Sequence, residues 1–64
     1  MQPYQERVIA ERDELEPKIT RLSKFLDSET CRSLPEAEQA RLLRQLGHMN
    51  GYHEVLDERI NAFT

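Results

Sequence analysis

Two histidines and a single cysteine are the side chains of this 64-residue chain that could act as nucleophiles, general bases or metal ligands. His48 and His53 are five residues apart, which is about 140° around a helix, so one chain cannot place both on the same metal ion. The His53-Glu54 pair also lacks the second histidine of the zinc motif His-Glu-x-x-His. We therefore expect no metal site.

Cys31 and the carboxylates give no stronger sign of catalysis. Cys31 has no histidine near it in the sequence, which favours a small turn residue or a weakly buried thiol over a nucleophile. As the only cysteine it cannot form an intrachain disulfide, which is typical of a reducing compartment. The 12 acidic residues show no pair placed so that one would be tuned as an acid. The sequence predicts a protein that is not an enzyme, has no catalytic residues and holds no cofactor.

A group of cationic, aromatic and small residues could bind a partner or a ligand. Arginine grips phosphates and carboxylates with two parallel hydrogen bonds, and a tyrosine ring can stack on a flat ligand. Two glycines in a Gly-x-x-x-Gly spacing would let a partner come close, although a helix can also simply tolerate them. The candidate partner or ligand surface comprises Arg12, Arg41, Arg44, Gly47, Gly51, Tyr52 and Arg59. The alternative for the arginines is an ordinary solvated face, because Glu38 lies near two of them.

An apolar seven-residue repeat must position these side chains in the C-terminal half. Its members are spaced alternately by four and three residues, so they form one stripe on a helix. They are Leu42, Leu46, Met49, His53, Leu56, Ile60 and Phe63. His53, the polar member, could be a ligand, a pH switch or a base, but a polar residue in such a seam commonly fixes helix register. Ser33 and Glu36 match a capping box, so we expect a helix from about Leu34 to Ala62.

A matching stripe runs through the N-terminal half and predicts a helix from about Pro3 to Asp27. Its members include Val8, Arg12, Leu15, Ile19, Leu22 and Leu26. Pro17 removes a backbone hydrogen bond at a cost of about 3 kcal/mol, so this helix must either kink or divide there. The stripe keeps its register through Pro17, which favours a kink. Residues 28–33 lack a period and are expected to form the turn.

Two long amphipathic helices joined by a short turn predict an all-α fold, a single-domain antiparallel helical hairpin. A fold at about Cys31 would place Leu15 near Gly47 and bring Arg12 to the level of His53. So short a chain buries only about 60% of its unfolded surface, so we expect self-association into a dimeric four-helix bundle or larger. The expected oligomer core comprises Val8, Leu15, Ile19, Leu22, Leu26, Leu42, Leu46, Met49, His53, Leu56, Ile60 and Phe63.

The composition narrows the classes of partner. The net charge is −3, which argues against nucleic-acid binding because that requires an excess of Lys and Arg. No apolar run approaches the roughly 18 residues of a membrane span. The first residues resemble neither a signal peptide nor a lipidation site. We therefore expect a cytoplasmic protein with no membrane association.

The motifs of the chain, taken together, resemble a family of small proteins encoded by bacteriophages and prophages. The likeness covers almost the whole chain and includes Tyr4-Gln5-x-Arg7-Val8, Leu34-Pro35-x-x-Glu38, Met49-x-x-Tyr52 and Arg59-Ile60-x-x-Phe63. Pro17, Gly47 and Gly51 depart from the smoother helical pattern of that family. The resemblance implies a phage origin and a helical hairpin, and it names no activity.

Three functions are compatible with these expectations, and the sequence favours the first, with the other two as alternatives. The first is a self-associating protein that binds, and inhibits or regulates, a host protein such as one of antiviral defence, as small phage proteins commonly do. The second is sequestration of a small anionic ligand such as a nucleotide between protomers, held by the arginines and Tyr52. The third is a virion or assembly component.

Overall fold

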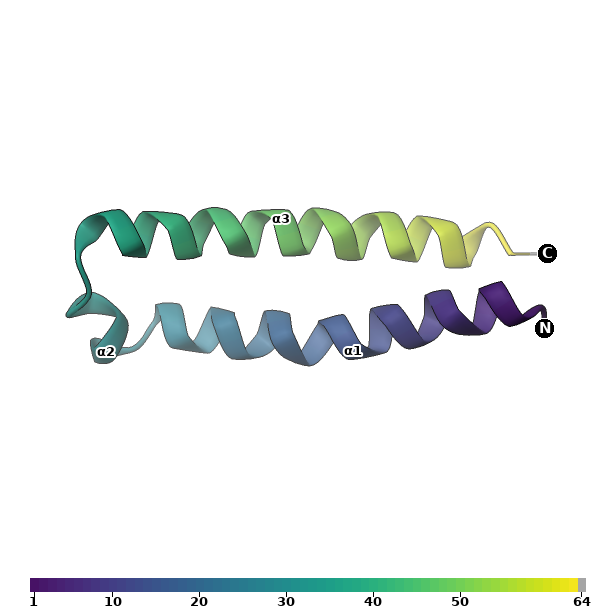
Figure 1. Cartoon of the computed structure of the whole chain (residues 1–64), viewed down its shortest axis with the longest axis horizontal. Helices are drawn as coiled ribbons and strands as arrows, with labels where there is room; N and C mark the ends of the chain where they lie inside the picture. The colour runs from purple at the N-terminus through teal and green to yellow at the C-terminus, as the bar shows by residue number, and fades with distance from the viewer. Residues whose placement is uncertain (64) are drawn as a thin grey trace.

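The computed structural model describes residues 1–63 and contains, in that range, the helices α1 (Pro3–Leu26), α2 (Glu29–Arg32) and α3 (Glu36–Asn61). Figure 1 shows α1 and α3 running antiparallel side by side, with α2 at the closed end and both termini at the other. The α carbons span 47 × 15 × 13 Å, so the molecule is a thin rod. The predicted all-α antiparallel hairpin is confirmed.

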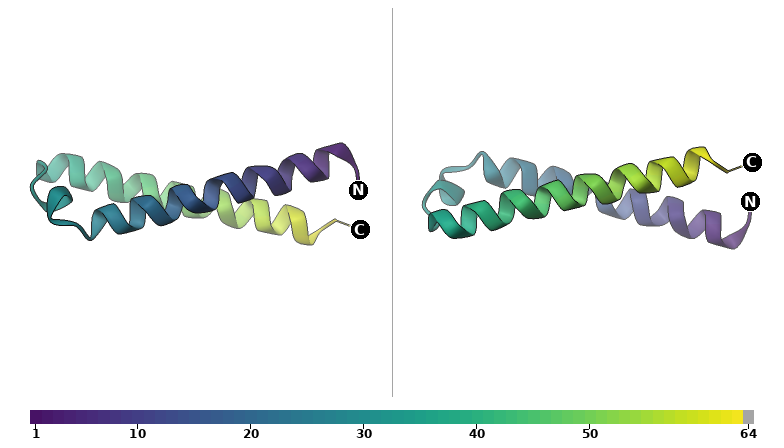
Figure 2. Two further views of the ribbon diagram at one scale, coloured as in Figure 1. Left: turned by 90° about the horizontal axis from the view of Figure 1, so that it is seen from below. Right: turned by 90° about the horizontal axis from the view of Figure 1, so that it is seen from above.

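The two long helices cross at a shallow angle, as both edge-on views in Figure 2 show. Heptad-spaced stripes produce such a crossing because a seven-residue repeat drifts slowly around a straight helix of 3.6 residues per turn. The crossing keeps the two stripes in contact along the rod.

The N-terminus of α1 is capped by side chains of its own first residues. Pro3 occupies the first turn, and the Gln5 side chain accepts a hydrogen bond from the backbone N–H of Gln2 at 2.8 Å. The helix continues through Pro17 as one element, so it does not divide there. Figure 1 shows this element as a gently curved ribbon.

The connection between the long helices is more ordered than the expected turn. Ser28 caps α2 by accepting a hydrogen bond from the backbone N–H of Cys31 at 3.1 Å. The Ser33 hydroxyl donates to the carbonyl oxygen of Thr30 at 2.6 Å and therefore closes α2. The expected capping box at Ser33 is wrong, because Pro35 is the N-cap of α3 and no side chain caps that helix.

The register of the hairpin also differs from the expected one. A fold at about Cys31 would place Arg12 near Met49 and His53, whereas Arg12 donates a hydrogen bond to Asp57, four residues beyond His53. Leu15 is therefore not opposite Gly47, where a Cβ atom would meet nothing within 4 Å. The reason is that α2 packs at the end of α1, so the chain crosses to α3 only after Arg32 and the hairpin is centred near the start of α3.

The core is the seam between α1 and α3. Val8, Leu15 and Leu56 are buried, and Leu56 has no exposed surface. Other stripe residues pack against them: Ile19, Met49, Ile60 and Phe63. Every stripe residue is buried or half-buried, so the two stripes face each other within one chain. Their part in an oligomer core stays a prediction.

Candidate functional site

One side of α3 carries an open groove with a volume of about 500 Å³. Its lining residues recur every three or four positions, so they follow a single side of the helix. They are Arg41, Arg44, Gln45, His48, Met49 and Tyr52. The structure thus brings together three members of the predicted surface, Arg41, Arg44 and Tyr52, and adds His48 to them. We call this set the arginine groove.

The arginine groove is cationic and carries a ring at one end. Arg41 donates through Nε to Glu38 Oε1 at 2.8 Å, which holds its guanidinium in place and uses one of five N–H donors. Within residues 1–63 Arg44 forms no ion pair. Tyr52 is 43% exposed, so its ring is accessible. The groove therefore suits a ligand that combines negative charge with a flat ring.

Four of the predicted surface residues do not line the groove. Arg12 lies in the seam, and Arg59 lies further along α3. Gly47 and Gly51 lie where an added Cβ would meet no atom of residues 1–63 within 4 Å. Neither glycine therefore serves a close contact within the hairpin, and a close approach by a partner or ligand stays a prediction.

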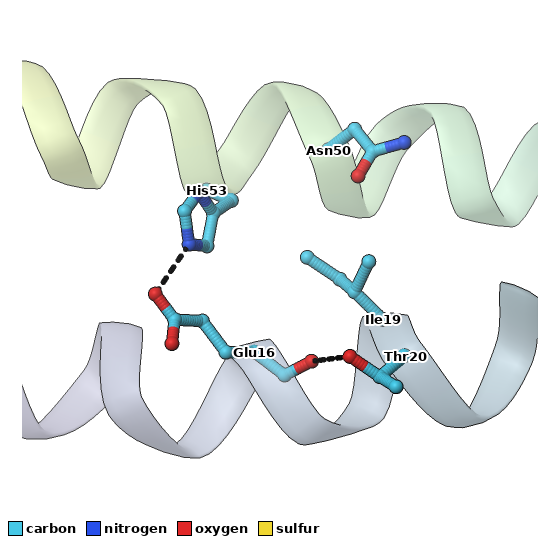
Figure 3. Close-up of a pocket in the computed structure, with 5 residues that line it drawn as sticks. All are labelled: Glu16, Ile19, Thr20, Asn50 and His53. Atoms are coloured by element: carbon cyan, nitrogen blue, oxygen red, sulfur yellow. Dashed lines mark hydrogen bonds and ion pairs between the residues drawn. The ribbon is translucent and has the colours of Figure 1, made fainter.

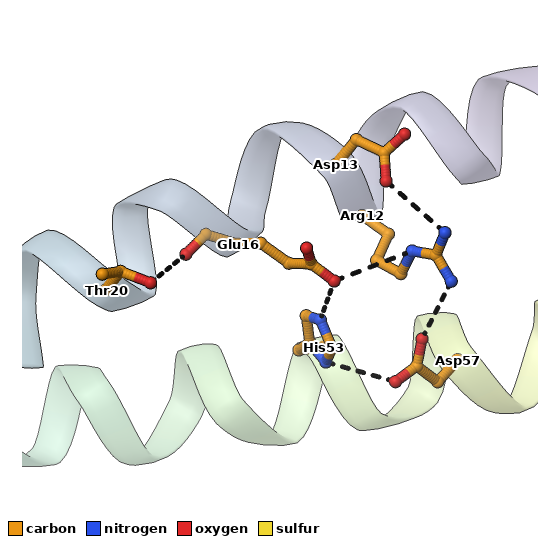
Figure 4. A network of polar contacts seen from close by, with 6 residues as sticks. All are labelled: Arg12, Asp13, Glu16, Thr20, His53 and Asp57. Carbon is orange, nitrogen blue, oxygen red and sulfur yellow. Dashed lines mark hydrogen bonds and ion pairs between the residues drawn. The ribbon is translucent and has the colours of Figure 1, made fainter.

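A closed ring of polar contacts links α1 to α3 near the middle of the rod, and we call it the polar layer. Its members are Arg12, Glu16, His53 and Asp57 (Figure 4). Asp57 accepts a hydrogen bond from Arg12 Nη1 at 3.3 Å and lies 3.4 Å from His53 Nδ1. Glu16 Oε1 lies 3.0 Å from His53 Nε2 and 3.9 Å from Arg12 Nε. Both ring nitrogens of His53 therefore face carboxylates, an arrangement that fixes the register of the two helices.

The positive charge of Arg12 is balanced by the carboxylates around it. Its pKa is raised, chiefly because it donates a hydrogen bond to Asp57; burial acts against this, and the nearby Asp13 carboxylate, 3.4 Å away, adds to it. Arg12 is thus always cationic and already engaged, so it does not belong with the arginine groove. Glu16 and Asp57 were not among the predicted residues, although each follows Arg12 or His53 by four residues, a spacing that places side chains together on a helix.

A second hollow, of about 260 Å³, lies beside the polar layer (Figure 3). It is lined by Glu16, Ile19, Thr20, Asn50 and His53. Much of its polar lining is already engaged, because Glu16 contacts His53 and the Thr20 hydroxyl donates to the Glu16 carbonyl at 3.2 Å. The hollow is therefore a notch in the seam with a carboxylate at its edge, which does not favour anions.

Residues 1–63 contain neither a metal-binding cluster nor a helix that could span a membrane. No three side chains of His, Cys, Asp or Glu in this range come together as metal ligands would. Neither long helix in the described part of the chain has an apolar stretch sufficient to cross a bilayer.

Known proteins identify the family of this chain. The Sequestin family model matches residues 2–62. An "uncharacterized 7.5 kDa protein in denB-rIIB intergenic region" of Enterobacteria phage T4 is 44% identical over 63 residues, which cover 98% of each chain. No solved structure matches the chain. The resemblance to small phage proteins is confirmed, and the chain belongs to the Sequestin family.

Proposed function

We propose that this protein is a non-enzymatic phage protein that self-associates and sequesters a small anionic ligand, such as a nucleotide, in the cytoplasm of the infected bacterium. The observation that carries the proposal is the arginine groove, where two guanidinium groups, an imidazole and an exposed ring share one side of α3. The family name Sequestin supports the holding of a partner rather than its chemical conversion.

The spacing of groups along the arginine groove fits a nucleotide. Arg44 and Tyr52 are eight residues apart, which is about 12 Å along a helix, and His48 lies halfway between them. A nucleotide likewise separates its flat base from its phosphates by a sugar. Tyr52 would stack on the base, while Arg44 and His48 would bind the phosphate oxygens.

The arginine groove requires a second wall before it can hold a ligand tightly. Small-molecule sites bury most of their ligand in a concave pocket, whereas this groove is formed by α3 alone. A second copy of the chain is the simplest source of that wall, because the seam of one hairpin buries few side chains completely. Self-association is therefore part of the proposed function.

Thermal unfolding with a panel of nucleoside mono-, di- and triphosphates and cyclic nucleotides tests the proposal. A ligand at about 100 times its Kd should stabilise the native state by about 2.7 kcal/mol and raise the Tm. Arg44→Ala and Tyr52→Ala should each reduce the rise, whereas Glu58→Ala, on an exposed position outside the groove, should leave it unchanged. No rise with any member of the panel would refute nucleotide sequestration.

Binding of a host protein is the second candidate, because two apolar side chains of α3 are exposed. Leu43 is 63% exposed and Val55 is 52% exposed. A host protein that the wild-type chain captures from lysate and Leu43→Asp does not would support this candidate. Recovery of the chain alone would contradict it, and co-purification with phage particles would favour a virion role instead.

A further inference from the structure

One column of side chains on α1 can pair with the same column of a second chain that runs in the opposite direction. The column repeats every seven residues, nearly two helical turns, and consists of Tyr4, Glu11, Lys18 and Phe25. It runs along one flank of the seam, where the Tyr4 ring meets the Phe63 ring edge to face at 5.9 Å. Tyr4 is 49% exposed despite this contact, and Glu11 and Lys18 are exposed.

The order of residues in this column favours antiparallel over parallel pairing of two chains. Reversal places Tyr4 opposite the partner's Phe25 and Glu11 opposite the partner's Lys18. Parallel pairing instead places Glu11 against the partner's Glu11 and Lys18 against the partner's Lys18, which are like charges. Within residues 1–63 neither Glu11 nor Lys18 forms an ion pair, so both charges are available to a partner.

Charge is distributed along the whole rod in the same order as along the column, negative toward the termini and positive toward the turn. The Glu16–His53 contact divides it into a terminal half, residues 1–16 and 53–63, and a turn half, residues 17–52. The terminal half has eight acidic and three basic residues, a net charge of −5, while the turn half has four acidic and six basic residues, a net charge of +2. Two rods lying side by side in opposite directions bring halves of opposite charge together, which favours their association.

We propose that a second copy of this chain packs antiparallel on this side of the hairpin, with α1 against the partner's α1 through the Tyr4, Glu11, Lys18 and Phe25 column. The proposal rests on the self-association in the proposed function and adds its orientation and its interface. Seven-residue spacing places Tyr52 and Arg59 on one flank of α3, the flank on which Phe63 meets Tyr4. The partner's α3 would therefore lie beside the Tyr52 end of the arginine groove, and its arginine end would stay open.

The area of this side is sufficient for a stable dimer. A standard interface buries about 800 Å² per partner. That is about one-sixth of the 4871 Å² accessible surface of the chain. The side of a rod 47 Å long and 15 Å wide has a projected area of the same order. One side of the hairpin can therefore bury what a dimer requires.

Charge exchange tests the interface. Glu11→Lys and Lys18→Glu should each weaken the dimer about tenfold at low salt, because each creates two like-charge contacts across the interface. The double variant Glu11→Lys/Lys18→Glu should restore the affinity, and an equimolar mixture of the single variants should form a heterodimer. Glu58→Lys, on the side of α3 away from α1, should have little effect. Sedimentation equilibrium measures all of these affinities.

Disulfide cross-linking tests the orientation. In a Cys31→Ala background of confirmed helicity, Glu11→Cys and Lys18→Cys chains should cross-link to each other when mixed. Neither should cross-link to itself, because seven residues separate the like positions by about 10 Å along the helix. Self-cross-linking of either variant would overturn the antiparallel arrangement.

The outcomes separate this proposal from the proposed function. A dimer whose affinity is insensitive to both single charge exchanges would overturn the interface and leave nucleotide sequestration standing. A monomer at all concentrations would overturn the interface together with the self-association. A failure of every nucleotide to raise the Tm, with the charge exchanges acting as expected, would overturn the ligand and leave the interface standing.

Discussion

At the scale of single residues, Leu56 is the most completely buried side chain of the seam. It has no exposed surface and belongs to one cluster with Val8 and Leu15. Leu56→Ala should lower the free energy of unfolding by about 2 to 5 kcal/mol, because it leaves a cavity that the rigid helices cannot close. Urea denaturation measures this loss. The matched Glu58→Ala change, on an exposed position, should alter stability by less than about 0.5 kcal/mol. Equal losses would mean that the buried face of α3 is wrongly assigned.

The polar layer could be predicted in part from the types of residue in the two stripes. Arg12 and His53 were expected at one level of the hairpin as the polar members of their stripes, and Glu16 contacts both of them. The four-residue spacing could have indicated Glu16 and Asp57, but whether a carboxylate on one helix reaches the other helix depends on the register, which the sequence does not give. The arginine groove was found in part, since Arg41, Arg44 and Tyr52 share a helical spacing that sequence reveals, whereas His48 was judged only as a metal ligand.

At the scale of the elements, periodicity predicted both long helices but not their register. A stripe that repeats every seven residues makes equivalent apolar contacts when one helix slides by seven residues. In the observed register Arg12 donates to Asp57, about one helical turn beyond His53, whose level was expected. Only local features select among such registers, and here they are the short helix α2 and the polar layer. Short helical turns in connections carry no periodic signal, so the sequence could not reveal α2.

Gly47 and Gly51 should be weak points of α3 rather than contact points. Each lies in the helix interior with a normal backbone, and an added Cβ would meet nothing within 4 Å. Gly47→Ala and Gly51→Ala should therefore each raise the free energy of unfolding by about 0.5 to 1 kcal/mol, since alanine loses less backbone entropy on folding. Ala40→Gly, at another exposed position of α3, is the matched reverse change and should lower stability by a similar amount. A loss of stability on Gly→Ala would indicate that a partner approaches this face closely.

At the scale of the whole molecule, the hairpin is thin for the proposed role of holding a ligand. Its apolar seam is one layer deep, and Leu43, Tyr52 and Val55 remain exposed on α3. The sequence could indicate the phage family and the hairpin because both depend on local patterns. It could not identify a ligand, because the arginine groove has one wall in a single chain and a second wall is only part of the proposed assembly.

Self-association should make the stability of this protein depend on its concentration. If the native state is a dimer that unfolds to two chains, each tenfold increase in concentration should stabilise the native state by about 1.4 kcal/mol, because mass action favours the associated form. Thermal unfolding between about 1 and 100 µM should then show a Tm that rises with concentration. Glu11→Lys should need a higher concentration to reach the same Tm, and the double charge exchange should restore the wild-type curve. A Tm that is constant over this range would mean that the single hairpin is itself the stable unit, and the exposed side chains of α3 would then have to serve a different partner.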